Sequence, residues 1–302
     1  MPDKPAAELE IDEPLVRLLV DAQAGAIQGS TLPLEYVEDG WDCSVWRLGA
    51  RYSVRLPRRA MAAALVDGEH RHLPAIADRL SDSGVGVPAP VLRGAPAQRY
   101  PWPWSVVPWF DGLSGMRVPR AERDGWATRL AEALLALHAP SGGDHPINPY
   151  RGVPFAGRAD VIARRFAALR AARTSDGWRI DRLERMWDDA LHSAPWSGRP
   201  VWIHGDLHPG NLIARGGELV AIIDFGDLTA GDPAYDLAIS LLAFDEPGQA
   251  AFRRATGTRY DEATWIRARG WAAADTLMFL LHTDDDPEYA AFGREALASL
   301  TA

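Results

Sequence analysis

The chain is poor in two residue types, and each scarcity excludes a class of chemistry. Among its 302 residues there is one cysteine, Cys43, so no internal disulfide can form. A single lysine, Lys4, lies near the beginning, so any other positive side chain must be arginine or histidine. Without further cysteines or an HExxH-type spacing, we expect no zinc site. The low cysteine content fits a reducing compartment, and we expect a cytoplasmic protein.

Long apolar runs and an excess of basic residues are also missing. No stretch approaches the roughly 18 apolar residues of a membrane span, and the polar, acidic start predicts no signal peptide. Basic residues number 32 against 41 acidic ones, for a formal net charge of −9. Without such an apolar run we expect no membrane partner. Nucleic acid requires a basic surface, so we expect no nucleic-acid partner either. A cationic small molecule is permitted, and we expect a monomer or a weak dimer.

The first part of the chain predicts a small sheet with helices. Apolar spacing predicts a helix over 14–27 and a long helix over 60–80, although Gly68 and Pro74 argue against one continuous rod. Alternating, β-branched and aromatic residues predict strands, in a hairpin and two later segments. These predicted strands are 44–49, 52–57, 86–94 and 104–110.

The remaining chain is predicted to be mainly helical. Helices are expected over 126–139, 158–173, 180–194, 234–244, 261–282 and 287–300, with a turn at 175–177. Two short strands, 211–215 and 218–224, are joined at Gly216–Gly217. The fold class is therefore α+β, with a sheet-containing lobe of residues 1–111 and a helical lobe of residues 112–302.

Two stretches carry chemistry. Residues 204–211 read HGDLHPGN and residues 222–226 read IIDFG, which places Asp206, Asn211 and Asp224 close together in sequence. Metal-assisted phosphoryl transfer needs a carboxylate near the acceptor hydroxyl and oxygen ligands for Mg²⁺ on the nucleotide phosphates. The predicted hairpin folds back and returns the third residue to the first two. Each residue alone is common in turns, but the combined spacing indicates a kinase.

These motifs resemble the aminoglycoside phosphotransferase family of the protein-kinase-like superfamily. The resemblance rests on HGDLHPGN, VAIIDFGDLTAGDPAYDLA and GWDCSVWRLGARYSVRLPRR. It implies a bilobal kinase fold that binds ATP or GTP in its cleft. By the same resemblance, Asp206 matches the catalytic aspartate, and Asn211 and Asp224 match the two Mg²⁺ ligands.

The resemblance also implies a set of nucleotide contacts. Arg55 matches the basic residue that grips the phosphates, where lysine is usual, and Glu69 matches the helix acid that orients it. No G-x-G-x-x-G is present, so backbone near Ser44 is the candidate for covering the phosphates. The adenine is expected to meet the carbonyl of Pro108 and the amide of Phe110.

The acceptor is expected to be a small molecule, because only DLTA separates Gly226 from Gly231 and leaves no room for an activation segment. Residues 224–288 hold 13 acidic residues and 5 arginines, a net of −8. Part of this charge is expected to be structural, with Asp232 and Asp236 bracing the catalytic loop.

Other acids could surround a polycation and hold it by charge-assisted hydrogen bonds. These candidate acceptor residues are Asp227, Asp245, Glu246, Asp275 and Asp284–Asp286. The sequence thus favours O-phosphorylation of an aminoglycoside, as in antibiotic resistance. Two alternatives stay open: a kinase of a macrolide or small metabolite, for which Phe166, Leu169, Met186 and Trp187 could supply an apolar wall, and a catalytically silent nucleotide-binding module.

Overall fold

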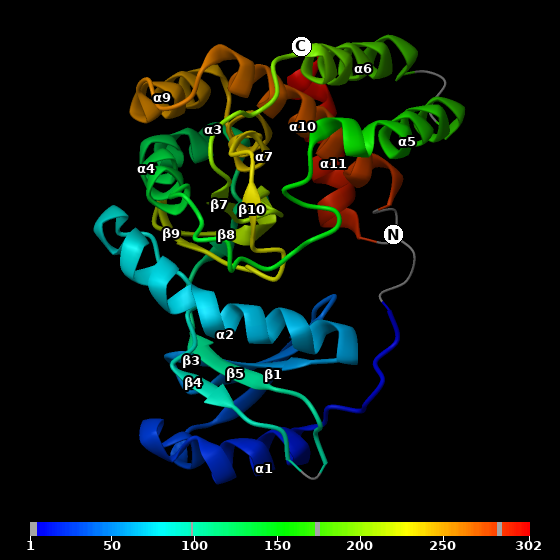
Figure 1. Ribbon diagram of the computed structural model, residues 1–302. Helices are drawn as coiled ribbons and strands as arrows, with labels where there is room; N and C mark the ends of the chain where they lie inside the picture. Colours follow the sequence, from blue (N-terminus) through cyan, green and yellow to red (C-terminus); the bar gives the residue numbers. More distant parts are fainter. Residues whose placement is uncertain (1–4, 98, 173–175, 283–285) are drawn as a thin grey trace.

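The computed structural model describes residues 5–97, 99–172, 176–282 and 286–302. Its chain forms a smaller lobe built on an antiparallel sheet and a larger, mainly helical lobe (Figure 1). The predicted α+β, two-lobe class is therefore confirmed. The sheet of the smaller lobe ends at Pro108, and Leu113 already pairs with a strand of the larger lobe, so the chain crosses between the lobes between these two residues.

The smaller lobe is a five-stranded antiparallel sheet in the order β1-β2-β3-β5-β4. Its strands are β1 (Leu34–Asp39), β2 (Cys43–Leu48), β3 (Tyr52–Pro57), β4 (Leu92–Gly94) and β5 (Trp104–Pro108). Helix α1 (Glu13–Gln23) covers one face and α2 (Ala60–Leu80) lies on the other, towards the larger lobe (Figure 1). Alternate residues of β2 and β3, such as Trp46 and Val54, pack with α1 in a core of their own.

Several predicted elements of this lobe need correction. Strand β1 was not predicted, and the first helix ends at Gln23 rather than continuing to residue 27. Of the predicted strand 86–94, only Leu92–Gly94 is a strand, because Pro88 and Pro90 have no N–H for a ladder. Helix α2, in contrast, runs unbroken through Gly68 and Pro74.

The larger lobe surrounds one buried helix, α10 (Glu262–Leu281), which packs against α5, α6, α7 and α11. The other helices are α3 (Arg120–Arg123), α4 (Ala127–Leu137), α5 (Ala159–Ala172), α6 (Gly177–His192), α7 (Ala234–Leu237), α8 (Ile239–Ala243), α9 (Glu246–Thr256) and α11 (Pro287–Leu300). Helix α9 was not predicted, and the predicted helix 234–244 is two short helices. Of the predicted turn 175–177, residue 175 lies outside the described residues.

Two small sheets in this lobe carry the motifs. Strand β6 (Leu113–Ser114) pairs with β8 (Leu212–Arg215), which pairs with β9 (Glu218–Ile222). Strand β7 (Val201–Ile203) pairs with β10 (Thr229–Gly231). The loop between β7 and β8 and the loop between β9 and β10 therefore lie together, and they carry HGDLHPGN and DFG.

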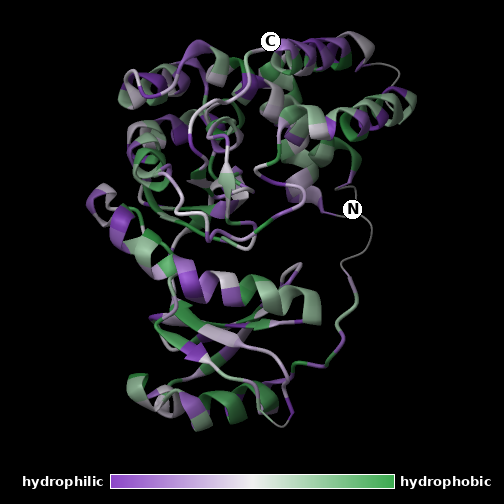
Figure 2. Cartoon of the chain, viewed as in Figure 1, coloured by the Kyte–Doolittle hydropathy of each residue, from purple (hydrophilic) through white to green (hydrophobic). Residues whose placement is uncertain are grey.

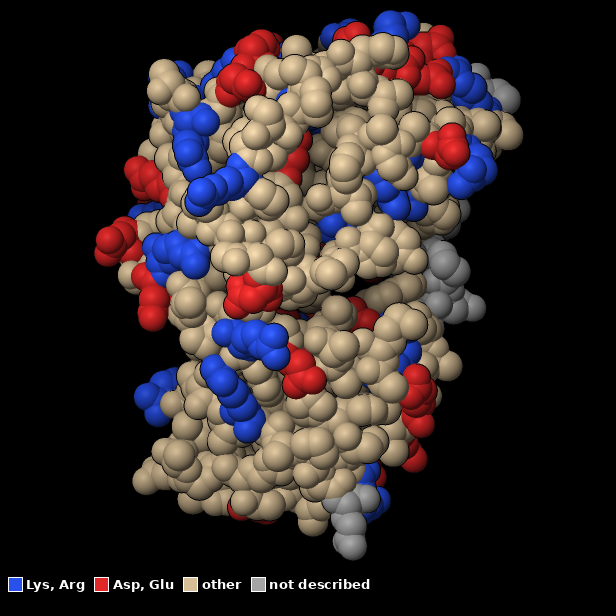
Figure 3. All heavy atoms as spheres, in the orientation of Figure 1, with Lys and Arg blue, Asp and Glu red and all other residues tan. Residues whose placement is uncertain are grey.

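The helices that cover the sheet mix hydrophobic and hydrophilic residues, as one-sided packing requires (Figure 2). Within the described ranges no helix combines the length and apolarity that a membrane span needs. A hollow separates the two lobes, with acidic side chains visible inside it (Figure 3).

Candidate functional site

The loop of residues 204–211, which follows β7 and is called the catalytic loop because it carries the predicted catalytic aspartate, is held in place by a buried carboxylate. Asp236, fully buried, accepts the backbone N–H of His204 at 2.7 Å and that of Gly205 at 3.1 Å. Gly205 has φ +84°, and a Cβ at this position would lie 2.4 Å from the carbonyl oxygen of Asp227. Only glycine fits this close approach, so the glycine after His204 sets the path of the chain into Asp206.

Hydrogen bonds join Asp206 to Asn211, and Asn211 to the residue before Asp224. The Asn211 side chain donates through Nδ2 to the backbone oxygen of Asp206 at 2.8 Å, and the backbone carbonyl of Asn211 accepts the N–H of Ile223 at 2.9 Å. The next residue, Asp224, has φ +61°, an unusual value for a side chain other than glycine. Such backbone strain is concentrated at functional sites, and this carboxylate is 58% exposed.

Arg55 and Glu69 form the ion pair expected from the sequence. Arg55 Nη1 donates to both carboxylate oxygens of Glu69, at 3.0 and 2.9 Å, and both side chains are largely buried. Burial opposes the charge on Arg55, but the adjacent carboxylate outweighs it and raises the pKa of the guanidinium. Its Nη2 lies 3.8 Å from Asp224 Oδ1, so the pair links the smaller lobe to the DFG loop.

The donor set fits Mg²⁺. Asn211 uses its amide nitrogen on Asp206, which leaves its side-chain oxygen available, and Asp224 presents an exposed carboxylate. Both are hard oxygen ligands of the kind that Mg²⁺ prefers on nucleotide phosphates. The described residues contain no cluster of three or more His, Cys, Asp or Glu side chains that could hold a metal without such a substrate.

The other residues predicted to contact the nucleotide are Ser44, Pro108 and Phe110. Ser44 lies in β2, not in a loop, and its buried hydroxyl accepts the indole N–H of Trp46 at 3.0 Å, so only its backbone remains as a candidate contact. Pro108 ends β5, and the Trp109 N–H donates to the Arg51 carbonyl at 2.8 Å. Among the described residues, no hydrogen bond to the next N–H, that of Phe110, is found.

Arg151, which motif spacing did not identify, occupies the centre of the site. Its Nη2 donates to Asp206 Oδ1 at 2.7 Å and its Nε to Asp227 Oδ2 at 3.0 Å, while Nη1 contacts the Tyr235 hydroxyl. The residue lies in an irregular segment between α4 and α5, 55 positions before Asp206. No local pattern in a Pro- and Gly-containing segment could have shown this contact.

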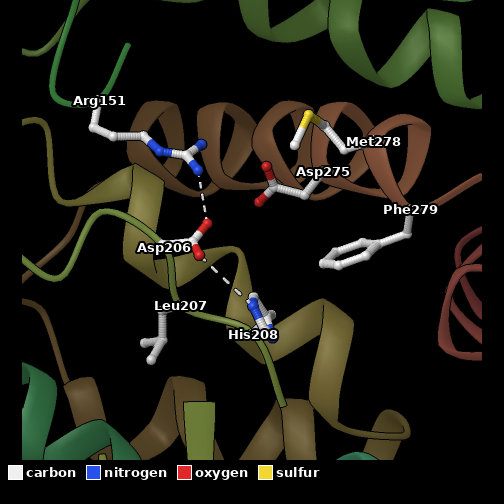
Figure 4. A pocket seen from close by; sticks show the side chains of 7 residues that line it. All are labelled: Arg151, Asp206, Leu207, His208, Asp275, Met278 and Phe279. Atoms are coloured by element: carbon white, nitrogen blue, oxygen red, sulfur yellow. Dashed lines mark hydrogen bonds and ion pairs between the residues drawn. The ribbon is translucent and has the colours of Figure 1, made fainter. Parts of the chain in front are cut away.

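A small cavity, open to solvent, adjoins Asp206 (Figure 4). Its lining comes from the catalytic loop, Arg151 and one face of α10. The residues are Arg151, Asp206, Leu207, His208, Asp275, Met278 and Phe279. The Asp275 carboxylate points towards Arg151 and Asp206, and it forms no hydrogen bond or ion pair with any described residue.

The other predicted acceptor acids are not gathered around this cavity. Both oxygens of Asp227 are occupied, by Asn148 at 2.7 Å and by Arg151. Asp245 pairs with Arg120 at 2.8 Å and begins α9, whose exposed first residue is Glu246, and α9 packs on α4 (Figure 1).

Asp286 caps α11, while residues 284 and 285 lie outside the described residues. Among the described residues of the predicted acidic set, Asp275 is the one that lines the cavity, and the ring around an acceptor stays a prediction. Asp227 and Asp245 are each paired with an arginine, and Glu246 and Asp286 lie at the starts of helices.

The pKa values of two aspartates at the site are shifted in opposite directions. Burial disfavours ionisation of Asp206, but Arg151 and the two nearby histidines, His208 and His204, outweigh it and hold its pKa below the ordinary value. Burial raises the pKa of Asp275 to about 7, with the Asp206 charge adding to the effect and Arg151 opposing it. One carboxylate is thus fixed as an anion, while the other titrates near neutrality.

Comparison with known proteins assigns the chain. Residues 33–275 match the phosphotransferase enzyme family. The chain belongs to this family. A homoserine kinase of Methylobacterium sp. (strain 4-46) is 29% identical over 213 residues, which cover 64% of this chain and 59% of that protein.

A second homoserine kinase, from Methylocella silvestris, is 30% identical over 186 residues, which cover 57% of this phosphotransferase and 53% of that protein. The chain therefore spans less than two thirds of the length of these relatives.

Solved structures show the fold of this phosphotransferase to be kinase-like. The GDP complex of aminoglycoside 2'-phosphotransferase-IIIa superimposes with a TM-score of 0.66 at 19% identity, covering 96% of this chain and 99% of that one. The macrolide 2'-phosphotransferase MphH from Brachybacterium faecium gives 0.57 at 21% identity, covering 93% and 97%. The expected bilobal kinase-like fold is confirmed.

Proposed function

We propose that this phosphotransferase moves the γ-phosphoryl group of ATP or GTP to a hydroxyl of a small, amine-bearing molecule. The supporting observation is the hydrogen-bonded unit of Asp206 and Asn211, with Asp224 in a strained backbone beside it. Two of the structural neighbours were solved with GDP and ADP, which supports a nucleotide donor. Mg²⁺, held by Asn211 and Asp224, would neutralise charge on the β- and γ-phosphates.

Each residue then has a defined task. Asp206 accepts the proton of the acceptor hydroxyl as its oxygen attacks the γ-phosphorus, and the bond from that phosphorus to the β–γ bridging oxygen breaks, releasing the nucleoside diphosphate. Arg55, oriented by Glu69, neutralises the α- and β-phosphates as a planar fork. Pro108 and Phe110 offer backbone groups to the base.

An amine on the acceptor is supported by Asp275. Its carboxylate faces the cavity beside Asp206 and has no described partner, so an acceptor ammonium would complete it. An aminoglycoside has such groups, and a structural neighbour was solved with kanamycin. The apolar wall that a macrolide would need is not supported, because Phe166, Leu169 and Trp187 are at most 3% exposed within the core.

A hydroxy amino acid is the second candidate acceptor. The sequence relatives are named homoserine kinases. Arg165 on α5 is close enough to interact electrostatically with Asp275 and Arg151, and it makes no hydrogen bond or ion pair with the described residues. An arginine and an aspartate near one cavity suit a molecule that carries both a carboxylate and an ammonium group.

The test is nucleoside diphosphate release with a panel of acceptors. The panel contains aminoglycosides, macrolides, L-homoserine and 3-amino-1-propanol, which resembles homoserine without its carboxylate. Asp206→Ala should lower turnover by roughly 10²–10⁴ with the best acceptor, because the proton acceptor is gone, and should leave nucleotide affinity nearly unchanged. Near-normal turnover in this variant would contradict the mechanism, and no turnover with any acceptor would favour a silent nucleotide-binding module.

One further variant distinguishes a hydroxy amino acid from an aminoglycoside as the acceptor. Arg165→Ala should raise the Michaelis constant for L-homoserine and leave that for 3-amino-1-propanol unchanged if a carboxylate binds there. An enzyme that turns over only aminoglycosides would instead reject the hydroxy amino acid.

A further inference from the structure

Arg151 is held at the catalytic loop more firmly than its irregular segment would suggest. Its side chain is 17% exposed, and its guanidinium contacts three groups from three places in the chain: Asp206, Asp227 and Tyr235. The cation also lies 5.5 Å from the centre of the Tyr235 ring. Arginine suits this position because its planar fork can serve several acceptors at once.

The backbone around Arg151 is docked as well. The side chain of Asn148 accepts the N–H of Tyr150 at 2.9 Å and that of Arg151 at 3.1 Å, and it donates to Asp227 at 2.7 Å. Gly152 has φ +67°, and a Cβ there would lie 2.6 Å from the carbonyl oxygen of Ala230 in β10. The segment 148–152 is therefore fitted to the strand that follows the DFG loop.

These contacts leave Asp206 with one available oxygen. Oδ1 is bound to Arg151, whereas Oδ2 lies 3.7 Å from His208 Nε2. The other ring nitrogen of His208 accepts the N–H of Gly210 at 3.0 Å, which fixes this ring in place. Oδ2 accepts no hydrogen bond from a described residue, so it is the oxygen that can receive a hydroxyl proton.

We infer that Arg151 is a positioning residue: it fixes the Asp206 carboxylate through Oδ1, so that Oδ2 is presented to the acceptor hydroxyl. This inference rests on the proposed function, and it adds that segment 148–152 is part of the catalytic machinery. In this phosphotransferase the orientation of the base depends on a segment that lies between α4 and α5, outside the kinase-like motifs.

The positioning itself can be tested without any acceptor. Hydrogen–deuterium exchange of the amides in residues 204–211 is measured by mass spectrometry for wild type, Arg151→Ala and Arg158→Ala. Arg158 belongs to the same connection between α4 and α5 but lies over Tyr150, 5.6 Å from its ring centre. Exchange should be about tenfold faster in Arg151→Ala and unchanged in Arg158→Ala, because only the first loses the anchor.

The consequence for chemistry is tested with water as acceptor. Phosphate release from Mg²⁺–ATP and, in parallel, Mg²⁺–GTP should fall about 10–100-fold in kcat for Arg151→Ala, with the nucleotide Michaelis constant within about twofold of wild type. Guanidinium ion added at millimolar concentration should restore several-fold of the loss, and Arg151→Lys should be intermediate. Neither Asp206→Ala nor Arg158→Ala should respond to guanidinium.

The outcomes separate this inference from the proposed function. Unchanged exchange in Arg151→Ala, or wild-type phosphate release without the arginine, overturns the positioning role. A loss of folding in Arg151→Ala moves the decision to Arg151→Lys, where unaltered exchange and kcat would overturn it. If the wild-type protein releases no phosphate and binds no nucleotide, the proposed function fails, while the exchange comparison still decides whether Arg151 anchors the loop.

Discussion

At the scale of single residues, contacts between candidate side chains were predictable where motifs place them. Asp206, Asn211 and Asp224 fall within 19 positions and lie together in the structure, and the Arg55–Glu69 pair forms as predicted. Arg151 was missed because its contact with Asp206 is set by tertiary packing, not by spacing. Asp245 was misplaced for the same reason, since charge in the sequence does not show that Arg120 will neutralise it.

Asp224 should be required for metal-dependent nucleotide binding. Asp224→Ala removes the charged ligand, so Mg²⁺ should no longer strengthen binding of ADP. Isothermal calorimetry with and without Mg²⁺ measures this difference. Asp232→Ala is a useful comparison, because that carboxylate is bound to Arg267 at 2.5 Å, and its Mg²⁺ response should persist. An unaltered Mg²⁺ response in Asp224→Ala would place the metal elsewhere.

Asp275 should make stability depend on pH. Its pKa is raised by burial to about 7 from an ordinary value near 4, so the unfolded chain gives up this proton at lower pH than the folded one. The resulting cost to folding is absent below pH 4, grows between pH 4 and 7, and is complete above pH 7, at up to about 4 kcal/mol.

Asp275→Asn should therefore melt at a higher temperature than wild type at pH 8.5 and at a similar temperature at pH 4. Asp245→Asn, which loses an ion-paired carboxylate, should show no such gain. Calorimetric melting of the three proteins at the two pH values decides this. Parallel wild-type and Asp275→Asn curves at both values would contradict the assigned environment.

At the scale of elements, helices and strands with one buried face were predicted from the sequence, whereas a strand without a buried face was missed. Five of the six residues of β1 are paired with β2, yet four of its positions are exposed, so it shows no apolar alternation to detect. The segment 86–91 is apolar enough to resemble a strand, but its prolines prevent a ladder. Instead, Gly86 pairs with Ala221 of β9 and so connects the two lobes.

The start of α7 should support the catalytic loop through Asp236. This buried residue accepts two loop amides and also bonds His138 Nε2 at 3.1 Å. Asp236→Ala leaves all three donors without their partner, and we expect a loss of about 3–5 kcal/mol in the free energy of unfolding. Urea denaturation measures the change.

A helix cap provides the matched control. Asp261→Ala removes the N-cap of α10, whose oxygen accepts Thr264 N–H at 2.8 Å, and should cost only about 0.5–2 kcal/mol. Equal losses in the two variants would show that Asp236 acts as an ordinary cap and not as the support of the loop.

At the scale of the whole molecule, the sequence showed where negative charge is in excess but not which groups the carboxylates contact. The net of −8 in residues 224–288 is partly compensated in three dimensions by arginines from elsewhere in the chain, including Arg55, Arg117, Arg120 and Arg151. Around the cavity, the structure leaves Asp275 as the one lining carboxylate without a described partner. The field felt by an acceptor is therefore weaker than the local composition indicates.

Salt dependence of the acceptor's Michaelis constant should report this field. A polycation attracted by many carboxylates would bind much more weakly as salt rises, because the screening length falls to about 10 Å at 0.1 M and less above it. A hydroxy amino acid, with no net charge, should respond little. The measurement varies salt at saturating nucleotide, since the charged nucleotide would otherwise contribute its own response.

Two variants connect the response to particular residues. If the acceptor is cationic and meets Asp275, Asp275→Asn should flatten the salt response, whereas Asp245→Asn should leave it as in wild type, because Asp245 is bound to Arg120 away from the cavity. A response that Asp245→Asn flattens as strongly would mean that the acceptor extends to α9, as a large aminoglycoside could. A flat wild-type response with an uncharged best acceptor would exclude the cationic acceptor and keep the phosphotransferase, because nothing in the roles of Asp206, Asn211 and Asp224 requires an amine.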